Sequence, residues 1–191
     1  MGALVSHTNA NSILSNIQAN IVAGGNAITV SVTGTQINPG LQKLVAACLA
    51  EMSEGTVRDT FLEQLSHFNR PPSRRTLRDK FVSAGCAETL YEFAMEAKEA
   101  FAKFFEITAR HPSGQAVLVA AFKHAYSVYQ EKIASDIDKL TFKQQSAIFE
   151  SDVVAFLSDN LTGLPEFYGR MEALGLLFYL GDNCFIEYAK C

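Results

Sequence analysis

The first 42 residues of this 191-residue chain contain no Lys, Arg, Asp or Glu, and all 16 basic and 20 acidic side chains follow from Lys43 onward. The uncharged segment is rich in Asn, Ser, Thr, Gly, Ile and Val, whereas the remainder shows the apolar spacing of helices. A strand without charged side chains lacks the charge repulsion that discourages pairing with a strand of another chain. We therefore expect two regions with different structures.

The uncharged segment has the sequence pattern of a β-hairpin. Apolar and polar residues alternate strictly over residues 28–32, which is typical of a strand with one apolar face. Residues 23–26, Ala-Gly-Gly-Asn, have the composition of a tight turn. The pattern predicts a hairpin in which residues 17–22 pair with residues 28–33.

We interpret residues 1–38 as a hairpin arm that makes contacts between copies of the chain. A two-stranded hairpin is marginal alone and needs another surface. That surface is either a neighbouring copy or the chain's own helices, and the sequence leaves both open. The oligomer contacts predicted for the arm are Ile17, Ile21, Ile28, Val30 and Val32.

The charged region predicts a helical bundle over residues 39–140. Asn38 and Pro39 form a helix start, with Asn as the N-cap and Pro at the first helical position. Apolar residues then recur at helical spacing as far as Gly55. Further helices are predicted over residues 56–68, 87–110 and 118–140.

Residues 141–191 predict a third unit, made of two helices and a β-hairpin and packed on the bundle. Thr141 and Gln144 form a capping box that starts the first helix, and Thr162 caps a second helix that ends at Gly175. Two short apolar runs then flank Gly181-Asp182-Asn183, which has hairpin turn chemistry. The predicted fold is mainly α, with an N-terminal β-hairpin arm and this C-terminal helix-helix-hairpin unit.

The order of elements over residues 147–190 resembles the winged-helix family. That resemblance implies a DNA-binding regulator whose second helix reads the duplex. The exposed residues of that helix are mostly acidic, and the turn of the wing contains Asp182, so phosphates would be repelled. The composition therefore favours a protein-docking unit over a DNA reader.

One dense basic stretch follows the double proline at residues 71–72. Its Arg and Lys side chains at a helix start are a candidate contact for an anion or an acidic partner. The alternative is a solvated helix face, or ion pairs with the acidic helix that follows. The candidate residues are Arg70, Arg74, Arg75, Arg78 and Lys80.

Asn38-Pro39, Arg58, Gln64-Leu65-Ser66 and Arg70-Pro71 together resemble the first helix pair of the rod-shaped plant-virus coat proteins. The resemblance covers about a sixth of the chain and implies a helical coat-type protein that packages nucleic acid. The paired-arginine RNA contact of that family has no counterpart here, and residues 152–191 extend beyond it. The net charge of -4 also disfavours nucleic acid as a partner.

Recognisable catalytic chemistry is absent from the sequence. It contains no phosphate-binding glycine loop, zinc-protease or hydrolase motif and no Cys/His metal cluster, so we expect no cofactor, no metal and no enzymatic activity. The four cysteines form no C-x-x-C pair, which favours reduced thiols over disulfides in a cytoplasmic protein. The sequence contains no run of 18 apolar residues, so we expect no transmembrane span. Gly2 lies in a weak N-myristoylation pattern. The leading hypothesis is an assembly or adaptor protein that associates with itself through the arm or with another protein.

Overall fold

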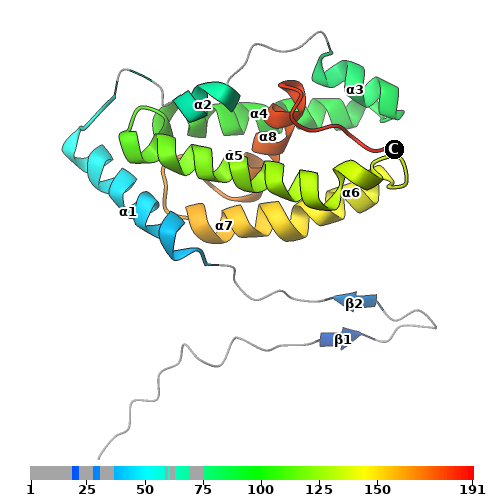
Figure 1. Cartoon of the computed structure of the whole chain (residues 1–191), viewed down its shortest axis with the longest axis horizontal. Coiled ribbons are helices and arrows are strands. Elements are labelled where there is room, and N and C mark those ends of the chain that lie inside the picture. Colours follow the sequence, from blue (N-terminus) through cyan, green and yellow to red (C-terminus); the bar gives the residue numbers. More distant parts are fainter. Residues whose placement is uncertain (1–18, 22–27, 31–36, 59, 61–62, 69–74) are drawn as a thin grey trace, which may run out of the picture. The chain divides into compact units, whose positions relative to one another are not determined.

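A computed structural model of the chain describes residues 19–21, 28–30, 37–58, 60, 63–68 and 75–191. The chain divides into two compact units, Met1–Thr35 and Gln36–Cys191. The second unit consists of helices, turns and a C-terminal extended segment (Figure 1). The prediction of a mainly α-helical chain is therefore confirmed.

The first unit contains two short strands, β1 (Ala19–Ile21) and β2 (Ile28–Val30). They pair antiparallel, with Asn20 opposite Thr29. Three-residue strands are shorter than the predicted hairpin, and a pair of this length is marginal without further support. Ile17, Val32 and Gly2 lie outside the described residues. The arm as a contact between copies stays a prediction.

Helix α1 (Pro39–Glu54) begins and ends where the sequence predicts. The Asn38 side chain accepts a hydrogen bond from the Leu41 backbone N–H at 3.0 Å, and Gly55 ends the helix in the left-handed conformation at φ 72°. The buried Asn160 fixes the start of α1, because its Oδ1 accepts from the Asn38 backbone N–H at 2.7 Å. α1 is thus held to residues far along the chain.

Two shorter helices follow. Helix α2 (Glu63–Phe68) covers only the second half of the helix predicted over residues 56–68, because residues 56–58 are not helical. Helix α3 (Leu77–Ala84) begins with a capping box between Thr76 and Asp79. Hydrogen bonds from Thr76 hold the pKa of the Asp79 carboxyl below its usual value.

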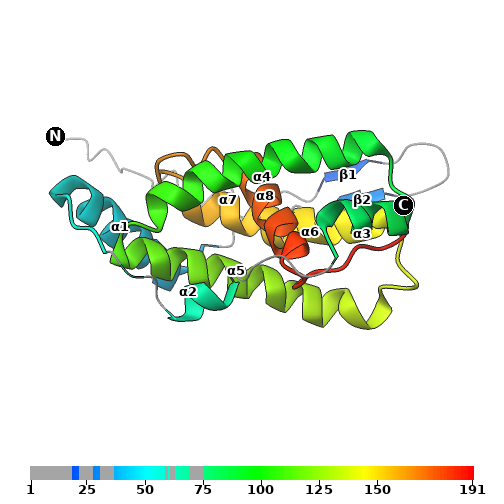
Figure 2. The same ribbon diagram turned by 90° about the horizontal axis from the view of Figure 1, so that it is seen from above.

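The two long helices are α4 (Glu88–Thr108) and α5 (Pro112–Lys132), and Figure 2 shows both along their length. No side chain of the α5 N-terminal turn caps that helix. Glu51 of α1 does so instead: its carboxylate accepts from the Ser113 backbone N–H at 2.9 Å and from the Ser113 hydroxyl at 2.6 Å. A carboxylate at this end also interacts favourably with the helix dipole.

Beyond a 3₁₀ turn at Ala134–Asp136, three helical segments follow one another without a break (Figure 1). They are α6 (Phe142–Phe149), the π-helical turn η3 (Glu150–Val154) and α7 (Ala155–Leu161). The predicted capping box of Thr141 and Gln144 starts α6. Residues 162–169 form turns in place of the second helix predicted there, and Gly163 and Gly169 have positive φ angles.

The predicted C-terminal hairpin, and with it the winged-helix unit, is wrong. Residues 176–182 continue helix α8 (Arg170–Asp182), which lies between α4 and α5 (Figure 2). Gly175 does not end this helix. A Cβ there would lie 2.6 Å from Phe101 Cβ and closer still to the Ala97 carbonyl oxygen, so glycine allows α8 to pack directly on α4.

The core lies where α4, α5 and α8 meet. Phe101 of α4, Phe122 of α5 and Tyr179 of α8 form a ring cluster with centroid separations of 5.5–5.8 Å. Aromatic contacts at these distances add to the stabilisation from apolar burial. The fold therefore depends on α8 being a helix on the inside of the bundle.

The cysteines differ from the expected reduced thiols. Cys86 and Cys191 form a disulfide, while Cys184 is exposed and Cys48 is buried on α1. Burial, together with the nearby Glu51 carboxylate, raises the pKa of the Cys48 thiol to about 11, so this thiol stays protonated at neutral pH. Within the described residues, no helix combines the length and apolar character needed to cross a bilayer.

Candidate functional site

The predicted basic contact is only partly described, since Arg70 and Arg74 lie outside the described residues. Arg75 is exposed, with Nη1 3.7 Å from a Glu187 carboxylate oxygen. Arg78 is also exposed; its Nη2 lies 2.8 Å from Glu88, and its guanidinium lies over the Tyr91 ring. Both arginines thus have carboxylate partners within the chain: Arg78 pairs with the acidic helix that follows, and Arg75 lies near Glu187 after α8. Their role toward an external partner stays a prediction.

Lys80 lies inside the protein, with a relative exposure of 1%. Its Nζ donates to the backbone carbonyls of Gly181 at 2.7 Å and Ile186 at 3.0 Å, and lies 3.1 Å from Glu187 Oε1. An ammonium group has three donors, and these three acceptors use all of them. Lys80 therefore joins α3 to the end of α8 instead of offering a charge to a ligand.

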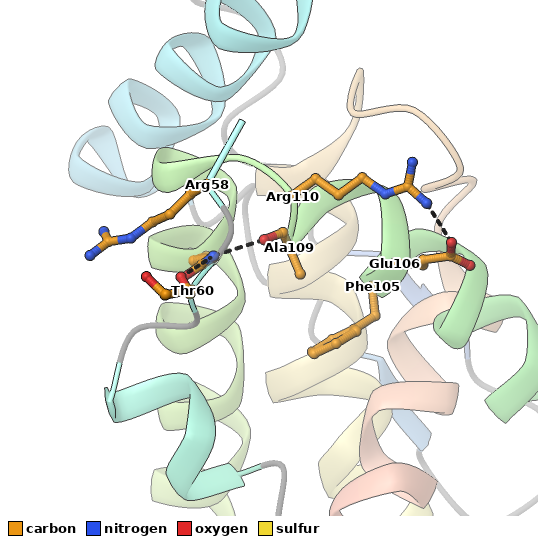
Figure 3. A pocket seen from close by; sticks show the side chains of 7 residues that line it. Arg58, Thr60, Phe105, Glu106, Ala109 and Arg110 are labelled. Carbon is orange, nitrogen blue, oxygen red and sulfur yellow. Dashed lines mark hydrogen bonds and ion pairs between the residues drawn. The ribbon is translucent and has the colours of Figure 1, made fainter. Parts of the chain in front are cut away.

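A hollow of about 280 Å³ lies beside the turn between α4 and α5 (Figure 3). Gln115 connects two sides of the hollow, because its side-chain amide donates to the Ala109 carbonyl at 2.9 Å and to the Thr60 carbonyl at 3.1 Å. Figure 3 shows the guanidinium groups of Arg58 and Arg110 pointing away from each other, with Arg110 directed at Glu106. The two charges do not converge on one ligand position.

A second, more apolar pocket of about 180 Å³ opens between α4, α6 and α8. We call it the α4–α6–α8 pocket. Its walls are aromatic and aliphatic, and several of the side chains are only half-buried. The lining residues are Leu90, Phe93, Phe142, Ser146, Phe149, Glu150, Arg170, Leu174, Leu177, Phe178 and Tyr188.

Two charged residues lie in the lining of this pocket. Arg170 begins α8 and Glu150 begins the π-helical turn, and Arg170 Nε donates to Glu150 Oε1 at 2.7 Å. Both side chains are substantially solvent-exposed, so the pair contributes little to stability. It places one positive and one negative group beside an apolar pocket.

Tyr188 forms one wall of the pocket and comes from the extended residues after α8. Its ring centroid lies 4.9 Å from that of Phe81, and its hydroxyl donates to the Leu177 carbonyl at 3.3 Å. Burial raises the pKa of Tyr188 well above its usual value, so the hydroxyl stays neutral and able to donate.

We call residues 184–191 the C-terminal strap. The buried Gln145 of α6 holds it twice, because its amide donates to the Glu187 carbonyl and its oxygen accepts from the Ala189 backbone N–H, both at 2.8 Å. The Phe142 backbone N–H donates to the Lys190 carbonyl at 2.7 Å. The strap thereby runs along the start of α6 and ends beside α3 (Figure 1).

Residues 76–188 match the model of a family described as CTD9, C-terminal domain 9 of the ABC-three component (ABC-3C) systems. The chain belongs to the CTD9 family. Comparisons with curated proteins and with solved structures found no match. The family description places CTD9 domains in systems of several components, so other protein components are the expected partners of such a domain.

The CTD9 segment contains the whole α4–α6–α8 pocket. It starts at Thr76, the N-cap of α3, and ends at Tyr188, and every lining residue lies between these two positions. The hollow of Figure 3 takes Arg58 and Thr60 from outside the segment. The α4–α6–α8 pocket is therefore the stronger candidate site for a function of the CTD9 fold.

No motif or spacing in the sequence indicates this pocket. Its apolar residues occupy the helical spacing of an ordinary core, and Glu150 and Arg170 are far apart in the chain without a motif. Among the described residues, no group of His, Cys, Asp or Glu is arranged to hold a metal ion. The pocket exists only in the tertiary structure, where α4, α6, α8 and the strap meet.

Proposed function

We propose that this CTD9 chain is a non-enzymatic assembly protein that binds another protein component of its ABC-3C system through the α4–α6–α8 pocket. The observation that carries the proposal is the size and chemistry of the pocket. Its volume of about 180 Å³ is below the range of roughly 300–1,000 Å³ in which drug-sized ligands and cofactors bind. A pocket of this size fits one apolar side chain of a partner, the usual anchor of a protein interface.

The lining also defines the chemistry of the partner. Phe93, Phe149 and Phe178 favour an aromatic or large aliphatic anchor, which buries most of its apolar surface against their rings. The Arg170–Glu150 pair beside the pocket favours polar or charged groups of both signs next to that anchor. The partner is therefore expected to present an apolar side chain within a polar surface.

Filling the pocket should weaken this interaction. In Ser146→Phe, a ring attached to α6 occupies the place of the anchor, and we expect the affinity for the partner component to fall about tenfold or more. The affinity is measured by titration calorimetry of the full chain with the other purified components of its system.

The matched control is Ala147→Phe. Ala147 is exposed on the same helix and does not line the pocket, so the same added ring should leave the affinity unchanged. Circular dichroism establishes that both variants fold. Equal affinities for Ser146→Phe, Ala147→Phe and the unmodified chain contradict the proposed role of the pocket.

We further propose that residues 1–38 mediate association between copies of the chain. The support is the absence of charge before Lys43 together with the antiparallel pair β1–β2, because both strands of a two-stranded sheet are edge strands and uncharged edges favour further pairing. Family membership favours this protein assembly role over packaging of nucleic acid, and the resemblance to coat proteins falls on residues before the CTD9 segment. We place the assembly in the cytoplasm.

Charges introduced into the arm should separate the copies. Ile28 and Val30 occupy alternate positions of β2, so the double substitution Ile28→Lys and Val30→Lys puts two charges on one face of the strand. We expect light scattering of the full chain to show a multimer that this variant converts to monomers. Thr29→Lys, on the opposite face, is the control and should keep the multimer. A monomeric unmodified chain excludes self-association.

A further inference from the structure

The C-terminal strap is held at its end by a covalent bond. Cys191 is the last residue of the strap and forms the disulfide with Cys86, which follows α3. Its backbone N–H also donates to the Ala84 carbonyl at 2.9 Å. Cys191 is exposed and Cys86 is half-buried, so a reductant reaches this disulfide without unfolding the core.

The strap separates two cavities. Tyr188 lines the α4–α6–α8 pocket on one side and, on the other, a polar hollow of about 380 Å³ that also includes Arg75, Ser83 and Lys190. Its ring lies between the rings of Phe81, Phe142 and Phe178. The Tyr188 ring forms one wall of the α4–α6–α8 pocket, so displacement of Tyr188 removes that wall.

We propose that the Cys86–Cys191 disulfide is a thiol-sensitive latch that keeps the strap, and with it the Tyr188 wall of the pocket, in place. The oxidised chain has the complete pocket. In the reduced chain the end of the strap detaches and the pocket is dismantled. The effect on partner binding rests on the function proposed above, whereas the release of the strap does not.

The hydrogen bonds that remain after reduction are few. Beyond Tyr188 the end of the strap is held by the Ala189 N–H, the Lys190 carbonyl and the Cys191 N–H, each with one partner, and by the small buried side chain of Ala189. Single hydrogen bonds contribute modestly, and a segment held by few of them opens locally more readily than the core helices. Nearer α8, the Ile186 side chain is buried, and the Ile186 carbonyl and the Glu187 carboxylate both contact Lys80 Nζ. We therefore expect the opening to stop at these residues.

The chemistry is thiol–disulfide exchange with a dithiol. One thiolate of the dithiol attacks a sulfur of the Cys86–Cys191 bond, and its second thiolate resolves the mixed disulfide. The dithiol loses two electrons and becomes a disulfide, while the two cysteines gain two electrons and two protons. Disulfides in the cytoplasm, where we place this protein, are usually transient or redox-sensing.

Hydrogen exchange of the full chain, with and without a dithiol reductant, tests the latch. We expect the amides of Ala189, Cys191 and Phe142 to exchange about tenfold faster or more after reduction, and the amides of α4 to change less than about twofold. A disulfide that is only a staple for the whole fold would accelerate all slow amides equally, and that result overturns the proposal.

Variants and thiol counting complete the test. Cys191→Ser should show the fast exchange without reductant, and Cys184→Ser, which keeps the disulfide, should respond to reductant like the unmodified chain. The denatured, unreduced protein should have two reactive thiols, Cys48 and Cys184; four reactive thiols overturn the latch. Reduction should also weaken partner binding about tenfold. Unchanged exchange in the strap refutes the latch, whereas failure of the Ser146→Phe experiment refutes only the binding role of the pocket.

Discussion

Replacing Gly175 by Ala should destabilise the protein by about 2 kcal/mol, although alanine is the better helix former. Helix propensity alone favours Ala over Gly by about 1 kcal/mol in a helix interior. The new Cβ collides with the Ala97 carbonyl and with Phe101, and overpacking of a dense core costs typically 1–3 kcal/mol, occasionally more. Because backbone of α4 is involved, no side-chain rotation relieves the collision, and we expect a cost at the upper end of that range.

Thermal unfolding followed by circular dichroism measures this effect. A loss of about 2 kcal/mol lowers the Tm of a domain of this size by roughly 4–8 °C. The comparison is Gly40→Ala in the first turn of α1, where the Cβ meets a single side-chain atom, the Asn38 Oδ1 that caps the helix, at 3.2 Å, so we expect a smaller loss than for Gly175→Ala. An unchanged or higher Tm for Gly175→Ala contradicts the direct packing of α8 on α4.

Replacing Lys80 by Met should lower the free energy of unfolding by about 3 kcal/mol. Methionine keeps the length of the apolar stem but removes the Lys80 donor from the Ile186 carbonyl and from the Gly181 carbonyl, which still accepts from the Cys184 backbone N–H at 3.1 Å. Each buried group left unsatisfied costs about 1–3 kcal/mol. Urea unfolding monitored by tyrosine fluorescence gives the free energy and shows whether the transition stays cooperative.

Arg75→Met is the control for this substitution, because both basic residues lie near Glu187. Arg75 is about half exposed, and an exposed ion pair contributes about 0–1 kcal/mol. A loss for Lys80→Met no larger than that for Arg75→Met shows that the buried hydrogen bonds do not carry the stability assigned to them.

Local signals in the sequence predicted the starts of α1 and α6 correctly, whereas the starts predicted at Thr56 and Thr162 are wrong. Asn38 and Thr141 make the cap contacts that their residue types favour, and Gly55 ends α1 with a positive φ. These features need only residues within one turn of one another. They are therefore readable without knowledge of the tertiary structure.

The sequence failed at α8 for an equally physical reason. A helix that is buried on most sides has no polar face, so its apolar run lacks the 3.6-residue period and reads equally well as a strand. The sequence predicts that Gly175 ends a helix, whereas in the structure the lack of a Cβ at Gly175 allows α8 to contact α4. Asp182 was interpreted as a turn residue, yet it accepts from the Leu77 N–H at 2.9 Å and pairs with Lys98.

The candidate site was beyond sequence analysis because it is assembled from distant parts of one fold. The wall residues Phe93, Phe149 and Tyr188 belong to different elements, and each alone is an ordinary core residue. The basic stretch was visible because its charges are consecutive. The sequence predicts that Lys80 contacts an anion or an acidic partner together with its basic neighbours. Only the tertiary structure shows that the Lys80 ammonium is buried.

The hydrogen bonds of Asn160 also bear on how the chain would hold several molecules together. The Asn38 backbone N–H and the Gln42 side chain both bind this residue of α7, so the N-terminal end of α1 is fixed on the helical body. A molecule bound by the arm proposed for residues 1–38 would then be tethered to that body, which raises its local concentration there. Asn160→Ala would weaken this junction while leaving the residues of both proposed binding surfaces unchanged.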